Sequence, residues 1–164
     1  MSMTDRPIET GLYTLIGPDD VEVSANDFSA TADLTIAATY GDLPRTRLVS
    51  GEIQGVLLVA SETGTGAVPD EPGWVYFFDV DPNTTSGDTA LELVDRQAII
   101  GQVAFAAADW DIDANGATAY KPVAIPFHAV TILYAVFRNL GGAINDNAAD
   151  NETLQINVWY RRDD

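Results

Sequence analysis

The sequence predicts an all-β protein, a β-sandwich of the jelly-roll kind with one short helix. Runs of β-branched and aromatic residues recur along the chain, clusters of Gly, Pro, Asp and Asn separate them, and only one short stretch has a helical pattern. About eight strands in a chain of 164 residues, with long loops between them, are typical of two packed sheets. An immunoglobulin-like sandwich is the alternative, although its cysteine pair is missing, and the order of the strands is not predicted.

Eight segments are expected to form strands, namely residues 11–16, 34–40, 47–61, 74–80, 99–112, 117–125, 129–138 and 154–161. The last one has the clearest alternation. One of its faces carries Leu154, Ile156, Val158 and Tyr160, and the other carries Gln155, Asn157, Trp159 and Arg161. Because alternate side chains of a strand point to opposite faces, we expect one of these sets to enter the core and the other to face solvent or a neighbour.

A short helix is expected within residues 86–100. Asp88 or Thr89 is suited to cap it, and Glu92 follows Thr89 by three residues, as in a capping box. The apolar stripe of this helix would consist of Ala90, Leu91 and Val94.

The chain length is appropriate for one domain. We expect residues 1–20 to form an extended N-terminal arm and residues 21–164 to form a single β-sandwich domain. Residues 61–73 and 141–152 are long, polar loops, and loops of this length in a compact domain are usually functional or contact a partner.

The chain is strongly acidic, with a formal net charge of -17 that comes from 25 acidic and 8 basic residues. Such a chain repels nucleic acids and anionic membranes, so we expect neither as a partner. It contains no cysteine, which excludes a disulfide framework. The N-terminal residues show no basic segment followed by an apolar one, so no secretory signal is predicted and synthesis in the cytoplasm is expected.

No catalytic constellation can be assembled from the motifs. His128 is the only histidine, no Gly-x-Ser-x-Gly motif is present, and zinc or cupin-type iron sites normally need at least two histidines. Nucleotide-binding glycine motifs are also missing. A hydrolase that uses a carboxylate pair is the remaining enzymatic alternative, and no motif supports it. We therefore predict a protein without catalytic residues and without a cofactor.

Asp111, Asp113 and Asn115, followed by Gly116, are spaced like the start of an EF-hand calcium loop. The twelfth position of that loop, which should be a glutamate, is Pro122. The pair Asn115-Gly116 favours instead a two-residue type I′ turn, in which Ala114 would pair with Ala117. A plain hairpin is the preferred interpretation, and these three residues are retained only as weak calcium candidates.

Residues 87–130 (GDTALELVDRQAIIGQVAFAAADWDIDANGATAYKPVAIPFHAV) and 152–164 (ETLQINVWYRRDD) resemble small jelly-roll proteins of tailed bacteriophages that decorate or cement the capsid. The resemblance covers about residues 85–164 and contains no single diagnostic motif. It implies a non-enzymatic virion protein that binds the major capsid protein on the outer surface of the capsid and stabilises the shell. It also implies a homo-oligomer, either a dimer or a trimer.

Two other functions remain open at this point. One is a lectin-like β-sandwich that binds carbohydrate, with calcium assistance in one version, and it predicts a solvent-exposed row of aromatic residues. The other is a phage tail or head-fibre component, which the sequence does not separate from a decoration protein.

Overall fold

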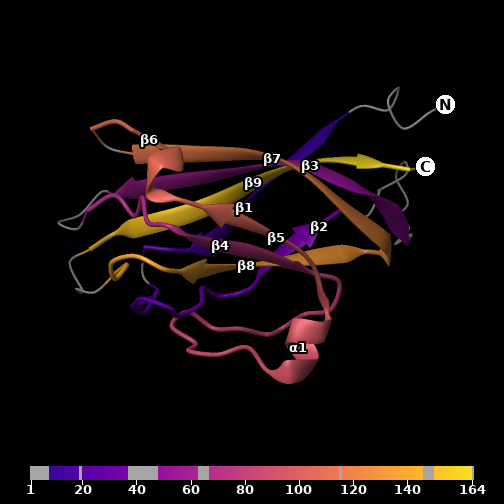
Figure 1. The fold of residues 1–164 in the computed structure, drawn as a ribbon, viewed down its shortest axis with the longest axis horizontal. Helices are drawn as coiled ribbons and strands as arrows, with labels where there is room; N and C mark the ends of the chain where they lie inside the picture. Colours follow the sequence, from indigo (N-terminus) through magenta and orange to yellow (C-terminus); the bar gives the residue numbers. More distant parts are fainter. Residues whose placement is uncertain are drawn as a thin grey trace.

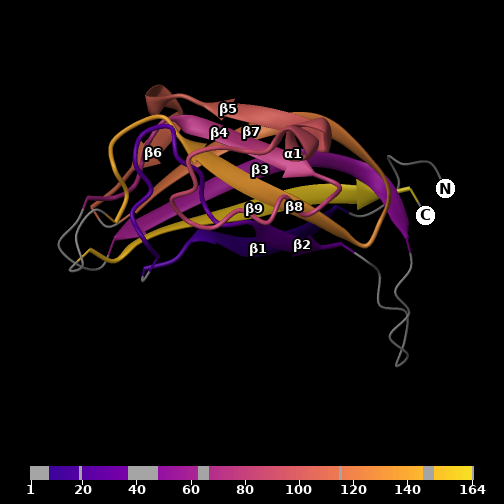
Figure 2. The same cartoon turned by 90° about the horizontal axis from the view of Figure 1, so that it is seen from below.

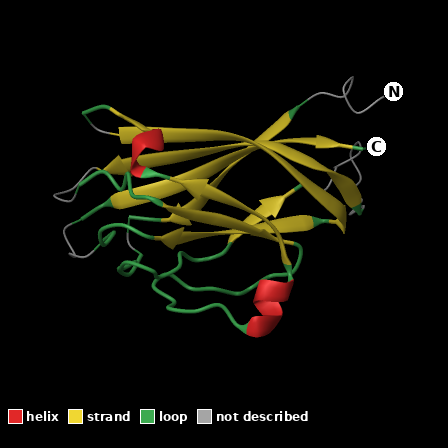
Figure 3. Ribbon diagram, in the orientation of Figure 1, coloured by secondary structure: helices red, strands yellow, loops and turns green. Residues whose placement is uncertain are grey.

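The computed structural model describes residues 8–18, 20–36, 48–62, 67–114, 116–145 and 150–163, and they form two antiparallel sheets packed as a sandwich (Figure 1). The strands of the first sheet are, in spatial order, β1 (Glu9–Ile16), β9 (Glu152–Arg162), β3 (Val49–Glu62), β7 (Gly116–Val130) and β6 (Trp110–Ile112). Those of the second sheet are β2 (Ala32–Thr35), β8 (Ile132–Asn139), β4 (Gly73–Phe78) and β5 (Ile99–Phe105). Strands make up most of the ordered structure (Figure 3).

The strand order is that of a jelly roll. Apart from the short β6, the first strand pairs with the last and each following pair is nested inside the one before: β1 with β9, β2 with β8, β3 with β7, and β4 with β5. A long hairpin of four nested pairs that is rolled into two sheets gives this arrangement. The prediction of an all-β jelly-roll sandwich with a short helix is therefore confirmed, and the strand order, which was not predicted, is now defined.

The core lies between the two sheets. The alternation expected in β9 is present, because Leu154, Ile156, Val158 and Tyr160 are buried while the residues between them are partly exposed. They pack with the inward side chains of the second sheet, among them the fully buried Phe77 and Phe137. Burial of one large apolar side chain contributes about 1.5–3 kcal/mol, so this interface supplies most of the driving force for folding.

A smaller apolar cluster covers the outer face of the second sheet. Phe28 and Leu91, which come from two loops, pack on Phe78 and Val136. The Phe28 amide donates a hydrogen bond of 2.7 Å to the Asp88 carbonyl, which joins the two loops. Figures 1 and 2 show α1 (Leu93–Gln97) beside this sheet.

The predicted helix exists, but its start and its cap were wrong. α1 begins after Glu92, without a side-chain cap, and none of its residues is buried. Asp88 is unable to cap it because its carboxylate accepts hydrogen bonds from the Thr85 amide (2.8 Å) and hydroxyl (3.0 Å). Leu91 is buried but precedes the helix, and Val94 is exposed.

The segment 99–112, expected as one strand, contains two. β5 belongs to the second sheet and β6 to the first, and a single 3-10 turn (Ala107–Asp109) carries the chain between them. The Asp109 carboxylate stabilises this turn, because it accepts a hydrogen bond from the Ala106 amide (2.7 Å) and pairs with Lys121 (2.9 Å).

The boundary expected between residues 125 and 129 was also wrong, because β7 continues to Val130 and β8 starts at Ile132. Pro122 and Pro126 are tolerated inside β7 since β6 pairs only with residues 117–119 and leaves that edge of the strand free.

Residues 9–16 of the predicted N-terminal arm form β1, which pairs with β9 from Glu9 opposite Tyr160 to Ile16 opposite Leu154. This part of the predicted arm is a strand of the sandwich, and residues 1–7 lie outside the described residues. Within the described part of the chain, no helix has the length and apolar character needed to cross a membrane.

Candidate functional site at the loop end

Three connections meet at one end of the sandwich, at the left of Figure 1. They are the β3–β4 connection, the β6–β7 hairpin and the β8–β9 connection, and we call their described residues the loop end: 67–72, 113, 114, 140–145, 150 and 151. The loop end contains most of the described residues of both loops that the sequence singles out as contact segments. It also contains one of the three calcium candidates, Asp113, and a second, Asp111, lies in the adjoining strand.

Glu71 joins the β3–β4 connection to the β8–β9 connection and to the start of β6. Its carboxylate accepts a hydrogen bond from the Gly142 amide (2.9 Å), and its carbonyl accepts one from the indole Nε1 of Trp110 (3.1 Å). The Leu140 amide donates to the Pro72 carbonyl (2.9 Å) in the same place. Hydrogen bonds therefore join the β3–β4 and β8–β9 connections to each other and to the start of β6.

Two buried asparagines hold the β8–β9 connection in place through side-chain hydrogen bonds. Asn139 is fully buried, and its amide nitrogen donates to the carbonyls of Val23 (3.0 Å) and Gly142 (2.7 Å), while its oxygen accepts from the Gly141 amide (3.0 Å). Through Val23 it also binds the β1–β2 connection. Because buried polar groups are costly when unpaired, these bonds hold both connections in one conformation.

Asn145 plays the same part at the start of β9. Its side-chain nitrogen donates to the carbonyls of Gly17 (3.0 Å) and Glu152 (3.1 Å), and its oxygen accepts from the Glu152 amide (3.0 Å). Its backbone is left-handed, with φ 55°, a conformation that asparagine adopts more readily than most residues. The sequence alone gave no signal for Glu71, Asn139 or Asn145, because each depends on contacts between distant segments.

A group of carboxylates lies where β3 ends and β9 begins. Glu62 and Glu152 are register partners in the β3–β9 ladder, and Asp150 precedes Glu152 by two residues. Asp150 and Glu152 are both buried. Burial raises the pKa of Glu152, the negative charges of Asp150 and Glu62 raise it further, and the hydrogen bond from the Asn145 amide opposes this change.

The hairpin prediction was correct in kind and wrong in register. Ile112 pairs with Ala117, Asp111 with Thr118 and Trp110 with Ala119, which is a shift of two residues from the predicted pairing. The reason is Asp113, whose carboxylate accepts a hydrogen bond from the Gly116 amide (2.9 Å) and whose own amide donates to the Gly116 carbonyl (2.9 Å). These bonds place Asp113 in the turn.

A shift by two leaves each side chain on the same face of the sheet as in the predicted pairing, because the side-chain period of a strand is two. Trp110, Ala117 and Ala119 are accordingly buried, whereas Asp111 and Thr118 are exposed. Asn115 lies outside the described residues.

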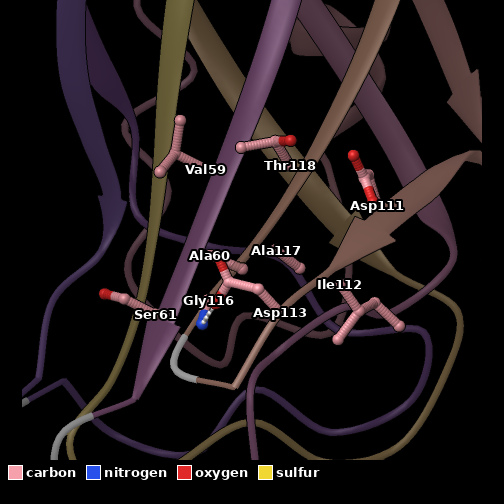
Figure 4. A pocket seen from close by; sticks show the side chains of 9 residues that line it. All are labelled: Val59, Ala60, Ser61, Asp111, Ile112, Asp113, Gly116, Ala117 and Thr118. Carbon is pink, nitrogen blue, oxygen red and sulfur yellow. Dashed lines mark hydrogen bonds between the residues drawn. The ribbon is translucent and has the colours of Figure 1, made fainter.

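A hollow of about 390 Å³ lies beside the hairpin (Figure 4). It is lined by Val59, Ala60, Ser61, Asp111, Ile112, Asp113, Gly116, Ala117 and Thr118. Figure 4 shows Ser61 and Asp111 on opposite sides of it. Among the residues with described positions, no group of three or more His, Cys, Asp or Glu side chains is arranged to hold a metal ion.

His128 is exposed and lies near the end of β7, at the opposite end of the strand from the hairpin. It is therefore remote from the loop end.

Two apolar side chains are exposed at the loop end or directly beside it: Ile112 is 56% exposed and Leu140 is 40% exposed. Exposed apolar side chains on a hydrogen-bonded framework are suited to bind another protein, because little conformational entropy is lost when they dock.

No family model and no curated protein matches the sequence. Structural similarity is found to chains in virus structures. A chain of deformed wing virus, a honeybee pathogen, has 10% identity and a TM-score of 0.34, and the match covers 99% of this chain and 47% of that one. A chain of maize chlorotic mottle virus has 8% identity and a TM-score of 0.28, with 94% and 92% covered. A chain of Israeli acute paralysis virus, from particles heated to 63 degrees, has 10% identity and a TM-score of 0.32, with 99% and 74% covered.

The present protein thus spans about half of the deformed wing virus chain. Nothing in these similarities is specific to tailed-phage decoration proteins.

Proposed function

We propose that the protein is a structural component of a virion, a decoration or cement protein that binds the outer surface of a phage capsid and stabilises the shell without catalysis. The observation that carries this proposal is the loop end. The β3–β4 and β8–β9 connections are joined there through Glu71, which also binds the start of β6, and the surface around them presents Ile112 and Leu140.

The remaining features are compatible with this role. The jelly roll gives a rigid body that places all three connections at one end, and preorganised loops lower the entropic cost of docking. A chain of charge -17 would be repelled by packaged DNA inside a shell, whereas binding to the outside of a shell requires no positive charge. Weak contacts by individual copies would suffice, because many copies act on one shell.

Co-sedimentation with shells tests this proposal. The shells are assembled from the major capsid protein that the same genome encodes. We expect the wild-type protein to pellet with them and Ile112→Asp and Leu140→Asp each to weaken binding about tenfold, since a charge is placed at an apolar contact.

Val80→Asp is the matched control, because Val80 is 61% exposed and lies in the β4–α1 connection, outside the loop end. It should bind like the wild type. Equal loss of binding by all three variants, or no binding by the wild type, would remove the proposal.

One observation favours carbohydrate binding as a second candidate function. The rings of Trp74 and Tyr76 on β4 stack at 6.4 Å with an interplanar angle of 24°, and flat aromatic surfaces of this kind can pack on sugar rings. Both residues are only partly exposed. Titration with soluble oligosaccharides, followed by tryptophan fluorescence, tests this function, and Trp74→Ala should abolish any saturable response.

A further inference from the structure

A broad uncharged patch covers the outer face of the first sheet. The register of four neighbouring strands aligns twelve outward positions in three rows. The rows are Thr10, Trp159, Gly55 and Pro122; then Leu12, Asn157, Leu57 and Tyr120; and then Thr14, Gln155, Val59 and Thr118. We call these twelve residues the neutral face.

The neutral face contains no Asp, Glu, Lys or Arg, although charged residues make up 20% of the chain. Charged side chains concentrate on protein surfaces, so composition alone does not predict a patch of this size without any charge. Two copies of a protein with charge -17 repel each other over most approaches. Within the neutral face itself, two such copies have no carboxylates to bring together.

Two aromatic side chains pack against each other on the neutral face. The rings of Tyr120 and Trp159 meet edge to face at 5.5 Å, and both lie over Gly55. A Cβ at Gly55 would lie 2.9 Å from the Tyr120 hydroxyl and 3.3 Å from Trp159, so glycine leaves the space that the rings occupy. Tyr and Trp are enriched at the centres of protein interfaces.

Charged residues border the neutral face on two opposite sides. On one side, Arg161 follows Trp159 on the same face of β9, and its register partner is Glu52 of β3. On the other side, Asp111 of β6 is the register partner of Thr118, which belongs to the third row.

We infer that the neutral face binds a second copy of this chain, face to face, about a twofold axis that lies in the plane of the interface and passes near Leu57. This axis brings Arg161 of each copy to Asp111 of its partner at both ends, so the face is complementary to itself. An isologous contact of this kind is the usual way in which homodimers form. The inference concerns self-association and does not depend on the proposed binding to a capsid.

The size of the neutral face indicates a weak, reversible dimer. Four strands that are about 4.8 Å apart and three rows that are about 6.8 Å apart cover roughly 400 Å² in projection. A standard interface buries about 800 Å² on each partner. The monomer and the dimer should therefore both be populated, and the balance between them should depend on protein concentration.

Sedimentation velocity over a range of concentrations tests the inference. The wild type should form dimers as the concentration rises, and Leu12→Asp, which places a charge on a 56% exposed position of the neutral face, should remain monomeric. Arg161→Glu and Asp111→Arg should each raise the dissociation constant about tenfold. The double variant with both changes should recover to within about threefold of the wild type, because the two charges are only exchanged.

Asp33→Arg is the control for total charge. It makes the same change as Asp111→Arg at an exposed position of β2, on the other sheet. Simple repulsion between acidic copies predicts that both variants associate more strongly, whereas the neutral-face dimer predicts weaker association only for Asp111→Arg. A wild type that stays monomeric at every concentration, a double variant that fails to recover, or equal effects of Asp33→Arg and Asp111→Arg would each overturn the inference. Circular dichroism of each variant verifies folding.

Discussion

Glu62 and Glu152 are opposite each other in the antiparallel ladder of β3 and β9, and Glu152 is only 4% exposed. Like charges in this position oppose strand pairing. The backbone amide of Asn145 donates a hydrogen bond to the Glu152 carboxylate. This bond holds the buried carboxylate next to the loop end, although the Glu62 carboxylate repels it.

The first prediction concerns pH. Because burial and the neighbouring carboxylates raise the pKa of Glu152 in the folded state, the folded state binds a proton more tightly than the unfolded state. The ionisation of Glu152 therefore lowers the free energy of unfolding as the pH rises through the pKa that Glu152 has in the folded state. This stability is regained as the pH falls towards the ordinary glutamate pKa of about 4.3.

Glu152→Gln removes this ionisation while an oxygen remains for the Asn145 amide. We expect the variant to be more stable at neutral pH, by roughly 3 °C in Tm, and the difference from the wild type to disappear as the pH falls. Thermal unfolding of both proteins at several pH values measures this, with the exposed Glu92→Gln as control. A constant difference at all pH values would show that charge is not the cause.

The second prediction concerns Asn139. Asn139→Ala leaves the Gly142 carbonyl and the Gly141 amide without their partner and removes one of the two hydrogen bonds to the Val23 carbonyl, so we expect a loss of about 2–4 kcal/mol in the free energy of unfolding. Denaturant unfolding measures it. Gln102→Ala, at an exposed position of β5, should change this free energy by less than about 0.5 kcal/mol. Equal effects would mean that Asn139 does not hold the connections.

The third prediction concerns the close approach of β3 and β9 at Gly51. A Cβ there would lie 2.0 Å from the Arg161 carbonyl oxygen, and backbone cannot move aside without breaking the ladder. Gly51→Ala should cost more than about 2 kcal/mol, whereas Gly17→Ala, whose nearest neighbour would be 3.6 Å away, should be close to neutral. Denaturant midpoints of the two variants decide this, and a tolerated Gly51→Ala would contradict the register of β3 and β9.

The fourth prediction concerns calcium. The Asp113 carboxylate accepts the Gly116 amide as part of a turn, so we expect millimolar calcium to leave the Tm unchanged. Asp113→Ala should lower the free energy of unfolding by about 1 kcal/mol through the loss of this hydrogen bond, equally with and without calcium. Isothermal titration that shows saturable heat for the wild type and none for Asp113→Ala would instead establish a calcium site.

The sequence was informative where local patterns determine structure. Alternation identified the buried face of β9, and the residues Asn115-Gly116 indicated a hairpin. It was uninformative where distant segments meet. The register of that hairpin depends on the Asp113 side chain, the cap of α1 is lost because Asp88 binds Thr85, and the strand order follows from pairings such as β1 with β9. The loop end was predicted only as two separate loops, since Glu71 joins them through a contact that no local pattern encodes.

The central claim is that the loop end attaches this protein to the outside of a capsid. Electron cryo-microscopy of shells incubated with the protein tests it most directly. We predict additional density at symmetric positions on the outer surface, with the end that carries Glu71, Ile112 and Leu140 against the shell. Shells without such density, or density in which the opposite end of the sandwich, near His128, meets the shell, would contradict the claim.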